Sequence, residues 1–261
     1  MSGTPVTALT IAYDGAPFAG FARQPGRPTV QGRLEDALRV ALRREVAIVG
    51  AGRTDAGVHA RAQVVSFISA PGDEASDALR TSVNALAGPD IAVSEVRSAV
   101  PGFSARYDAV MREYRYLVVP GPVPPVALSG RAWWSKRSLD LDAMREGASN
   151  LIGEHDFRSF CVTGSAEGKR TLREIAVLEI GETCELGEPC VVIRVAGRSF
   201  LHSMVRIMVG SLVEVGRGRR DPAWVADAVA AGKRGAAGQT APPHGLTLWS
   251  VSYPEEYWLQ P

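Results

Sequence analysis

The sequence predicts an α+β protein built from two halves of similar size. The chain has 261 residues, enough for two domains that each bury a core. Segments with strand patterns alternate with amphipathic helical patterns, and few of them form the tight β-α-β crossovers of a parallel sheet. A stretch with four prolines at 120–129 is predicted to be a linker, and similar order resumes after it. We therefore expect two halves, 1–119 and 120–261, with an active site in a cleft between them.

The first half is expected to contain two helices. An alternating segment that ends in Asp-Gly predicts a strand at 8–15. Thr29 is expected to cap a helix whose apolar side chains recur at helical spacing from Val30 to Leu42. A second amphipathic helix is expected at 76–86. Further strands are predicted at 45–49, 62–68, 91–96 and 112–119.

The second half repeats this kind of order. Helices are predicted at 141–151, at about 200–215 and at 222–231, and strands at 174–180, 190–195 and 246–253. Apolar residues cover nearly the whole circumference of the helix at 200–215, which indicates that it is buried.

Composition favours a cytoplasmic globular protein without a membrane segment or a metal site. Apolar residues make up 46% and charged residues 22% of the chain. No apolar run reaches the roughly 18 residues of a membrane span, and the N-terminus lacks the basic region of a signal peptide. The three cysteines form no even framework, and the four histidines are scattered.

The basic residues are mostly arginine. Net charge is +1, and only three of the 29 basic residues are lysines, namely 136, 169 and 233. Codon bias in a GC-rich genome is the simplest explanation, although arginine also suits RNA because it binds phosphate and stacks on bases. Local groups could form a basic surface: Arg23, Arg27 and Arg33; Arg106, Arg112 and Arg115; Arg217, Arg219 and Arg220.

The most informative segment is GRTDAGVHA at 52–60. Its glycine spacing does not fit a dinucleotide-binding fingerprint, and no Gly-Lys-Ser/Thr ends it as in a phosphate-binding P-loop. If the backbone from Arg53 to Asp55 is extended, both side chains project to one side. A guanidinium there would keep the carboxylate ionised and oriented, as a nucleophile requires. The alternative is an ordinary turn aspartate that bonds its own backbone.

Two other segments carry candidate site residues. Arg206 lies in the apolar helix and needs a carboxylate or a phosphate nearby, with an ion pair to Glu214 as the structural alternative. Gly210, one turn later, is expected to leave open space beside it. Tyr114 and Tyr116 fall on one face of a strand, where an aromatic ring could stack on an unstacked base. The alternative is two half-buried tyrosines of a sheet.

Together these segments resemble the tRNA pseudouridine synthase A family. The resemblance covers nearly the whole chain. The string RTDAGVH resembles the family's active-site motif, and the flanking blocks that match in order lie at 13–38, 103–116, 153–160, 200–210 and 241–253. Three positions depart from common family versions and affect RNA contact or packing regions: Ala22, Ser104 and the pair His202-Ser203.

The resemblance implies two pseudo-symmetric ferredoxin/RRM-like halves with a combined central antiparallel sheet and a basic cleft. It also implies a homodimer that modifies uridines 38, 39 and 40 in the anticodon arm of tRNA, without a cofactor. By motif position Asp55 matches the catalytic aspartate, Arg53 and Arg206 the arginines around it, and Tyr114 the tyrosine that stacks on the target base. Tyr116 is the second choice for the stacking role.

Three other functions remain as alternatives at this point. A catalytically silent RNA-binding protein would be free to lose these four residues. A carboxylate-dependent hydrolase usually needs two paired acids, and no second carboxylate stands out beside Asp55. A synthase of the same family acting on another RNA is the hardest alternative to exclude.

Overall fold

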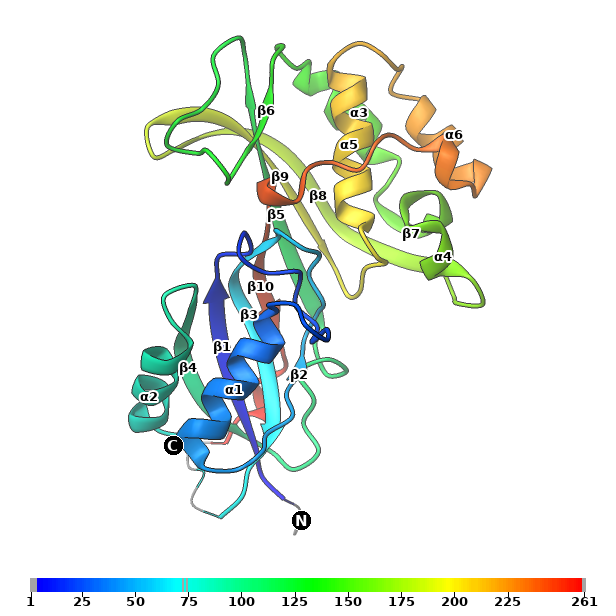
Figure 1. The fold of residues 1–261 in the computed structure, drawn as a ribbon. Coiled ribbons are helices and arrows are strands. Elements are labelled where there is room, and N and C mark those ends of the chain that lie inside the picture. The colour runs from blue at the N-terminus through cyan, green and yellow to red at the C-terminus, as the bar shows by residue number, and fades with distance from the viewer. Residues whose placement is uncertain (1–3, 72, 74, 260–261) are drawn as a thin grey trace. The chain divides into compact units, whose positions relative to one another are not determined.

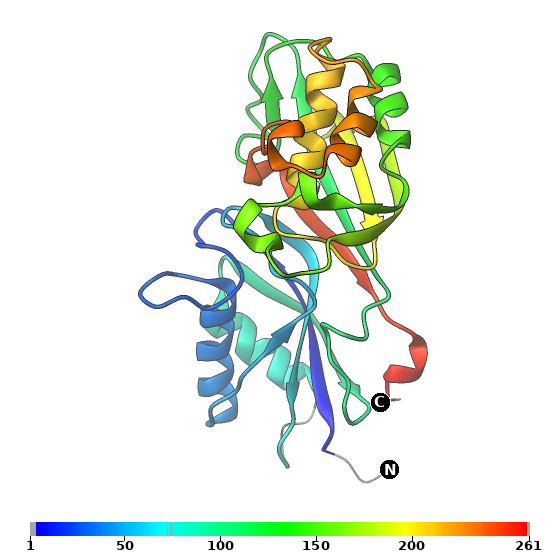
Figure 2. The same cartoon turned by 90° about the vertical axis from the view of Figure 1, so that its right-hand side faces the viewer.

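The computed structural model describes residues 4–71, 73 and 75–259, which form two compact units (Figures 1 and 2). Unit 1 comprises the described residues of Met1–Met111 and Leu248–Pro261, and unit 2 comprises Arg112–Thr247. Both units mix helices with mostly antiparallel strands, so the predicted α+β class is confirmed.

The units differ from the predicted halves, 1–119 and 120–261, at two places. Strand β5 (Met111–Pro120) hydrogen-bonds to β9 (Glu188–Gly197) and lies in unit 2 from Arg112 on. The C-terminal segment returns to unit 1, where Ser252 O accepts a hydrogen bond from Val110 N at 2.9 Å.

The predicted linker at 120–129 is wrong. This stretch lies inside unit 2, and the Glu188 carboxylate accepts hydrogen bonds of 2.7–3.0 Å from the backbone N–H groups of residues 126–128. The prolines shape a loop that this carboxylate fixes, rather than a spacer between domains.

The sheet of unit 1 is antiparallel. Strand β1 (Val6–Tyr13) lies between β4 (Ile91–Ala99) and β3 (His59–Ile68), and β2 (Val49–Gly50) pairs with β3. Helices α1 (Val30–Leu42) and α2 (Asp77–Ala87) cover one face (Figure 2). Thr29 caps α1 as predicted, because its Oγ1 accepts from Gly32 N at 3.2 Å.

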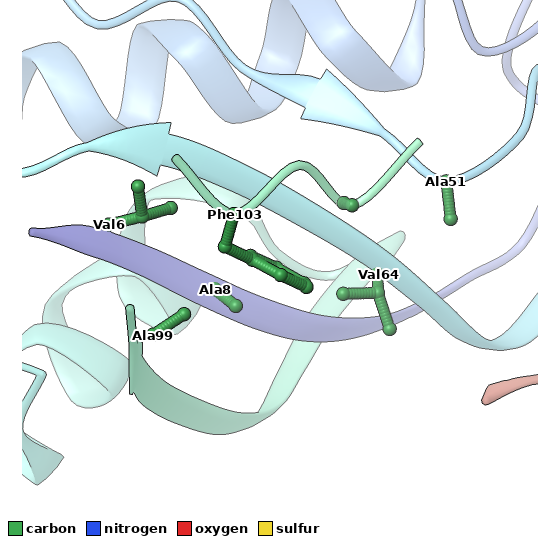
Figure 3. Close-up of a cluster of buried hydrophobic side chains, with 7 residues drawn as sticks. Val6, Ala8, Ala51, Val64, Ala99 and Phe103 are labelled. Carbon is green, nitrogen blue, oxygen red and sulfur yellow. The ribbon is translucent and has the colours of Figure 1, made fainter. Parts of the chain in front are cut away.

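Phe103 fills the opposite face of this sheet, among Val6, Ala8, Val64 and Ala99 (Figure 3). Its ring centroid lies 5.1–5.5 Å from the centroids of three aromatic rings of the C-terminal segment, those of Tyr253, Tyr257 and Trp258. Aromatic contacts of this kind add to the burial of apolar area. The C-terminal segment therefore completes the core of unit 1.

The sheet of unit 2 has the strand order β5-β9-β8-β7. Strands β8 (Leu172–Glu185) and β9 form a long hairpin, β7 (Gly153–Asp156) pairs with β8, and β6 (Trp133–Ser135) pairs in parallel with β5. The unit also contains the helices α3 (Leu141–Ser149), α4 (Thr163–Ala166), α5 (Met204–Gly216) and α6 (Trp224–Ala231). Eleven of the 13 residues of α5 are buried, as its all-round apolar pattern predicted.

Two local predictions were wrong. The segment 45–49 is mostly loop, although its apolar side chains Val46 and Ile48 are buried, because the Glu35 carboxylate accepts from Ile48 N at 3.2 Å and holds it there. Helix α5 begins at Met204 rather than near 200, because Ser203 adopts φ 58°, in the left-handed region. The short strands β6 and β7 were not predicted.

Candidate active site

Asp55 lies in the turn that connects β2 to β3 in unit 1. The turn is closed by a hydrogen bond of 3.2 Å from Val58 N to Asp55 O, and Gly57 supplies the positive φ of 77° that such a turn needs. Asp55 itself is half-buried. The carboxylate therefore stands on a short, closed turn at the start of a central strand.

Thr54, immediately before Asp55, fixes the turn from two sides. Its hydroxyl lies 2.8 Å from the Tyr13 hydroxyl, in a buried hydrogen bond at the end of β1. Its carbonyl oxygen accepts from Phe21 N at 3.0 Å. Because Thr54 is only 7% exposed, little water can replace these bonds, and the position of the turn depends on them.

The loop at 15–28 packs closely against this turn. A Cβ at Gly15 would lie 2.1 Å from Val58 O, and one at Gly20, where φ is +111°, would lie 3.1 Å from Thr54 O. Gly15 N also donates to Nδ1 of the buried His59 at 3.1 Å. Backbone thus packs on backbone, which only glycine allows at Gly15.

Arg53 does not contact the Asp55 carboxylate in the way that the spacing of the two residues suggested. It is exposed, and among the described residues no ion pair or hydrogen bond joins its guanidinium to the Asp55 carboxylate. The described residues thus contain no direct contact by which Arg53 would orient Asp55, and a role for Arg53 in the site stays a prediction. The hydrogen bonds of Thr54 and of the turn backbone hold this segment in place.

Tyr114 and Tyr116 lie on the same face of β5 in unit 2, and their surroundings differ. The Tyr116 ring is fully buried, its hydroxyl donates to Pro242 O at 2.8 Å, and a Cβ at Gly245 would lie 2.6 Å from it. Burial raises the pKa of Tyr116 far above its usual range, an effect that Arg206 partly offsets. Tyr116 is therefore a structural residue.

Tyr114 is 8% exposed and packs edge-to-face on Phe200, with ring centroids 5.1 Å apart. The stacking of the Tyr114 ring on a base stays a prediction that rests on the family resemblance.

Arg206 lies in the first turn of α5, where the 238–241 segment crosses the helix. Its Nε donates to Ala241 O at 2.8 Å, and Ala241 N donates to Arg206 O at 3.0 Å. The alternative ion pair with Glu214 is not formed, because the Glu214 carboxylate pairs with Arg219 at 3.2 Å and Arg217 at 3.7 Å. These two bonds with Ala241 fix the Arg206 backbone and the Nε of its guanidinium against the crossing segment.

The expected open space at Gly210 is wrong. A Cβ at this position would lie 1.8 Å from Gln239 O, so the crossing segment fills the space. Gly238 N also donates to Ser211 Oγ at 2.9 Å. Gly210 thus allows the segment that holds Arg206 to approach the helix.

Sequence reasoning missed the residues that support the turn, chiefly Tyr13, Thr54 and Phe21. For Tyr13 the sequence offered one indication, because this residue ends an alternating strand just before Asp-Gly. A side chain at the end of a strand lies next to the loops at that end of the sheet, where the turn with Asp55 also lies.

No group of three or more His, Cys, Asp and Glu side chains is arranged to hold a metal ion within the described residues. Over the same part of the chain, none of the helices combines the length and the apolar character needed to cross a bilayer.

Comparison with known proteins defines the class of enzyme. A family model described as tRNA pseudouridine synthase matches residues 9–108 and 148–254. The chain therefore belongs to the tRNA pseudouridine synthase family. It is an RNA pseudouridine synthase, an isomerase that modifies tRNA.

Curated relatives agree over nearly the full length. The tRNA pseudouridine synthase A of Brevibacillus brevis is 42% identical over 245 residues, which cover 93% of this chain and 97% of that protein. The enzyme of the same name from Methylocella silvestris is 44% identical over 252 residues, which cover 95% and 98%. Among solved structures, a chain of a Cbf5-Nop10-Gar1 complex matches with a TM-score of 0.34 and 17% identity, over 79% of this chain and 45% of that chain.

Proposed function

We propose that this enzyme converts uridine to pseudouridine at positions 38, 39 and 40 in the anticodon arm of tRNA, with Asp55 as its catalytic carboxylate and without a cofactor. The observation that supports this most is the Asp55 turn, which backbone and buried hydroxyl bonds hold in place in a member of this family. A carboxylate held in a fixed position can act repeatedly in the same geometry, as covalent or acid–base catalysis requires.

The reaction is an isomerisation. The C1′–N1 glycosidic bond breaks, the base turns, and a C1′–C5 bond forms, while the C5 hydrogen leaves as a proton and N1 takes one up. No electrons are gained or lost overall, so no redox cofactor or nucleotide is required. Three roles for Asp55 satisfy this balance: attack on C6 of the base, attack on C1′, and removal of a sugar proton.

Three other residues would complete the site. The target uridine must leave the base stack, and we propose that Tyr114 then stacks on it. We propose that Arg206, whose Nε is fixed on Ala241 O, binds the Asp55 carboxylate or a phosphate next to the target, and that the exposed Arg53 binds a phosphate there. Arg53 and Asp55 belong to unit 1, and Tyr114 and Arg206 belong to unit 2.

The family resemblance also motivates proposals about assembly. We propose that the units are the pseudo-symmetric halves of one fold, with a combined central sheet and a basic cleft, and that two chains form a homodimer in the cytoplasm. Sedimentation analysis of the purified protein tests the dimer, and a mass of about 28 kDa in solution would contradict it.

Modification at positions 38, 39 and 40 is tested with three tRNA transcripts. Each transcript has one uridine labelled with tritium at C5, and this uridine lies at position 38, 39 or 40. Release of tritium to water from each transcript, without added metal or nucleotide, is the expected result. A transcript with cytidine at all three positions and labelled uridines elsewhere is the control. Release from this control alone would show that the enzyme modifies another site, and release from neither would leave RNA binding as its only activity on these transcripts.

A further inference from the structure

A groove of about 1070 Å³ opens on unit 1, formed by the 15–28 loop, the exposed side of α1 and the end of α2. Its lining combines apolar side chains such as Phe18 and Leu86 with several arginines. All of its lining residues belong to unit 1.

The charge of the groove is positive. Four arginines line it against two aspartates, Asp36 and Asp90. Arg23 is neutralised, because its guanidinium lies 2.7 Å from Glu35 and 3.3 Å from Asp36. Arg39 lies 3.8 Å from Glu45.

Arg27 and Arg33 differ from the other two. Both are exposed, and in the part of the chain that the structure describes neither pairs with a carboxylate. The groove therefore presents two guanidinium groups without a protein counter-ion. Guanidinium groups of this kind bind phosphate in a bidentate manner.

The loop that carries Arg27 is closed on itself. Ala19 N donates to Pro28 O at 2.8 Å, Gln24 Nε2 donates to Ala19 O at 2.9 Å, and Arg27 N donates to Gln24 O at 3.3 Å. A loop whose ends are bonded loses less conformational entropy when it binds a ligand.

The same loop contacts the catalytic turn at its other end. Phe21 N donates to Thr54 O at 3.0 Å, and Gly20 packs on the same carbonyl. One short segment thus connects the groove with the residue that precedes Asp55. A polymer that runs past the catalytic turn is well placed to reach the groove.

We propose that this groove binds backbone phosphates of the substrate tRNA, away from the target nucleotide, through Arg27 and Arg33. The proposal rests on the proposed function for the identity of the RNA. A nucleic-acid backbone is the expected occupant, because this family acts on tRNA and phosphates can be bound by the two guanidinium groups alone.

The test is the affinity of Arg27→Gln/Arg33→Gln for unmodified tRNA, measured by fluorescence anisotropy over a range of salt concentrations. We expect binding about tenfold weaker than wild type near 0.1 M salt, and a slope of log Kd against log salt reduced by about 1 to 2. KM should rise while kcat at saturating tRNA stays within about twofold of wild type. Arg80→Gln, which removes one arginine paired with Asp77 on α2 at 3.1 Å, is the matched control.

A double variant that matches Arg80→Gln in affinity and in salt slope would overturn the proposal. Thermal unfolding of each variant shows whether the fold is intact, and Arg27→Lys/Arg33→Lys, which keeps the charge, should recover most of the salt slope. Failure of the catalytic proposal is separate, because it would appear as wild-type protein that binds tRNA with this arginine dependence and releases no tritium.

Discussion

Replacing Gly210 by alanine should destabilise the protein and impair catalysis, although glycine-to-alanine changes inside a helix normally stabilise. Gly210 lies in the middle of α5, where alanine is favoured over glycine by about 1 kcal/mol. The new Cβ, however, would lie 1.8 Å from Gln239 O, a distance at which the crossing segment must move.

The magnitude follows from the bonds that this movement breaks. Three hydrogen bonds tie the 238–241 segment to α5: Gly238 N to Ser211 Oγ at 2.9 Å, Ala241 N to Arg206 O at 3.0 Å and Arg206 Nε to Ala241 O at 2.8 Å. At about 0.5–1.5 kcal/mol each, their loss costs roughly 2–4 kcal/mol. After the propensity gain, we expect unfolding to become easier by about 1–3 kcal/mol, or roughly 3–10 °C in Tm.

Thermal unfolding and tritium release measured on the same samples test this prediction. Gly235→Ala is the matched control, because a Cβ there meets nothing within 4 Å and the position has no positive φ. We expect kcat/KM of Gly210→Ala to fall at least about tenfold at a temperature where it is folded, since the Arg206 side chain loses its backbone acceptor. If Gly210→Ala is as stable and active as Gly235→Ala, the close contact between Gly210 and Gln239 does not hold the crossing segment in place.

Three further predictions follow from other contacts. Tyr13→Phe and Thr54→Val each remove the hydroxyl hydrogen bond of 2.8 Å beside Asp55, so each should lower kcat more than it changes KM. In steady-state kinetics the double variant should be little worse than either single variant, and additive losses would contradict a shared contact. Burial raises the pKa of Glu113, but hydrogen bonds from Arg194 (3.0 Å) and Arg115 (2.9 Å) outweigh it and hold this pKa below its usual range. The resulting stability is present above the unfolded pKa of about 4.3 and is lost as pH falls through the folded pKa. Below about pH 4, the free energy of unfolding measured with denaturant should therefore fall less for Glu113→Gln than for wild type. The same dependence of this free energy on pH in both proteins would be inconsistent with the ion pairs of Glu113. Cys184 is exposed, whereas Cys161 and Cys190 are buried and burial raises the pKa of both thiols. Iodoacetamide at about pH 8 should therefore alkylate only Cys184 in the native protein, as peptide mass spectrometry can show. Rapid labelling of Cys161 would contradict its burial.

Periodicity predicted most helices and strands of this fold because their apolar faces are regular. The cap at Thr29 and the buried helix α5 were confirmed for this reason. Elements held by single long-range contacts could not be predicted: β6 has only three residues, and the 120–129 loop depends on Glu188, some 60 residues away. The return of the C-terminus to unit 1 depends on the rings around Phe103, which no local pattern reveals.

The site residues were chosen from local spacing and from resemblance, and their contacts were not predictable from either. Spacing alone suggested that Arg53 contacts Asp55, yet the turn is positioned by Thr54, Tyr13 and Phe21, which come from three segments. The Y-R-Y string left two candidate tyrosines, and the structural role of Tyr116 became visible only from its tertiary contacts with Pro242 and Gly245. An apolar helix around Arg206 likewise gave no sign of the segment that crosses it at Gly210.

The most direct test of Asp55 as the catalytic carboxylate is tritium release from C5-labelled uridine in tRNA, with wild-type protein and Asp55→Asn compared and no metal or nucleotide added. We expect release by wild type and none above background by Asp55→Asn, while both bind the tRNA equally well. Equal release by a folded Asp55→Asn would contradict the catalytic role of Asp55, because another group would then have to perform the chemistry assigned to this carboxylate.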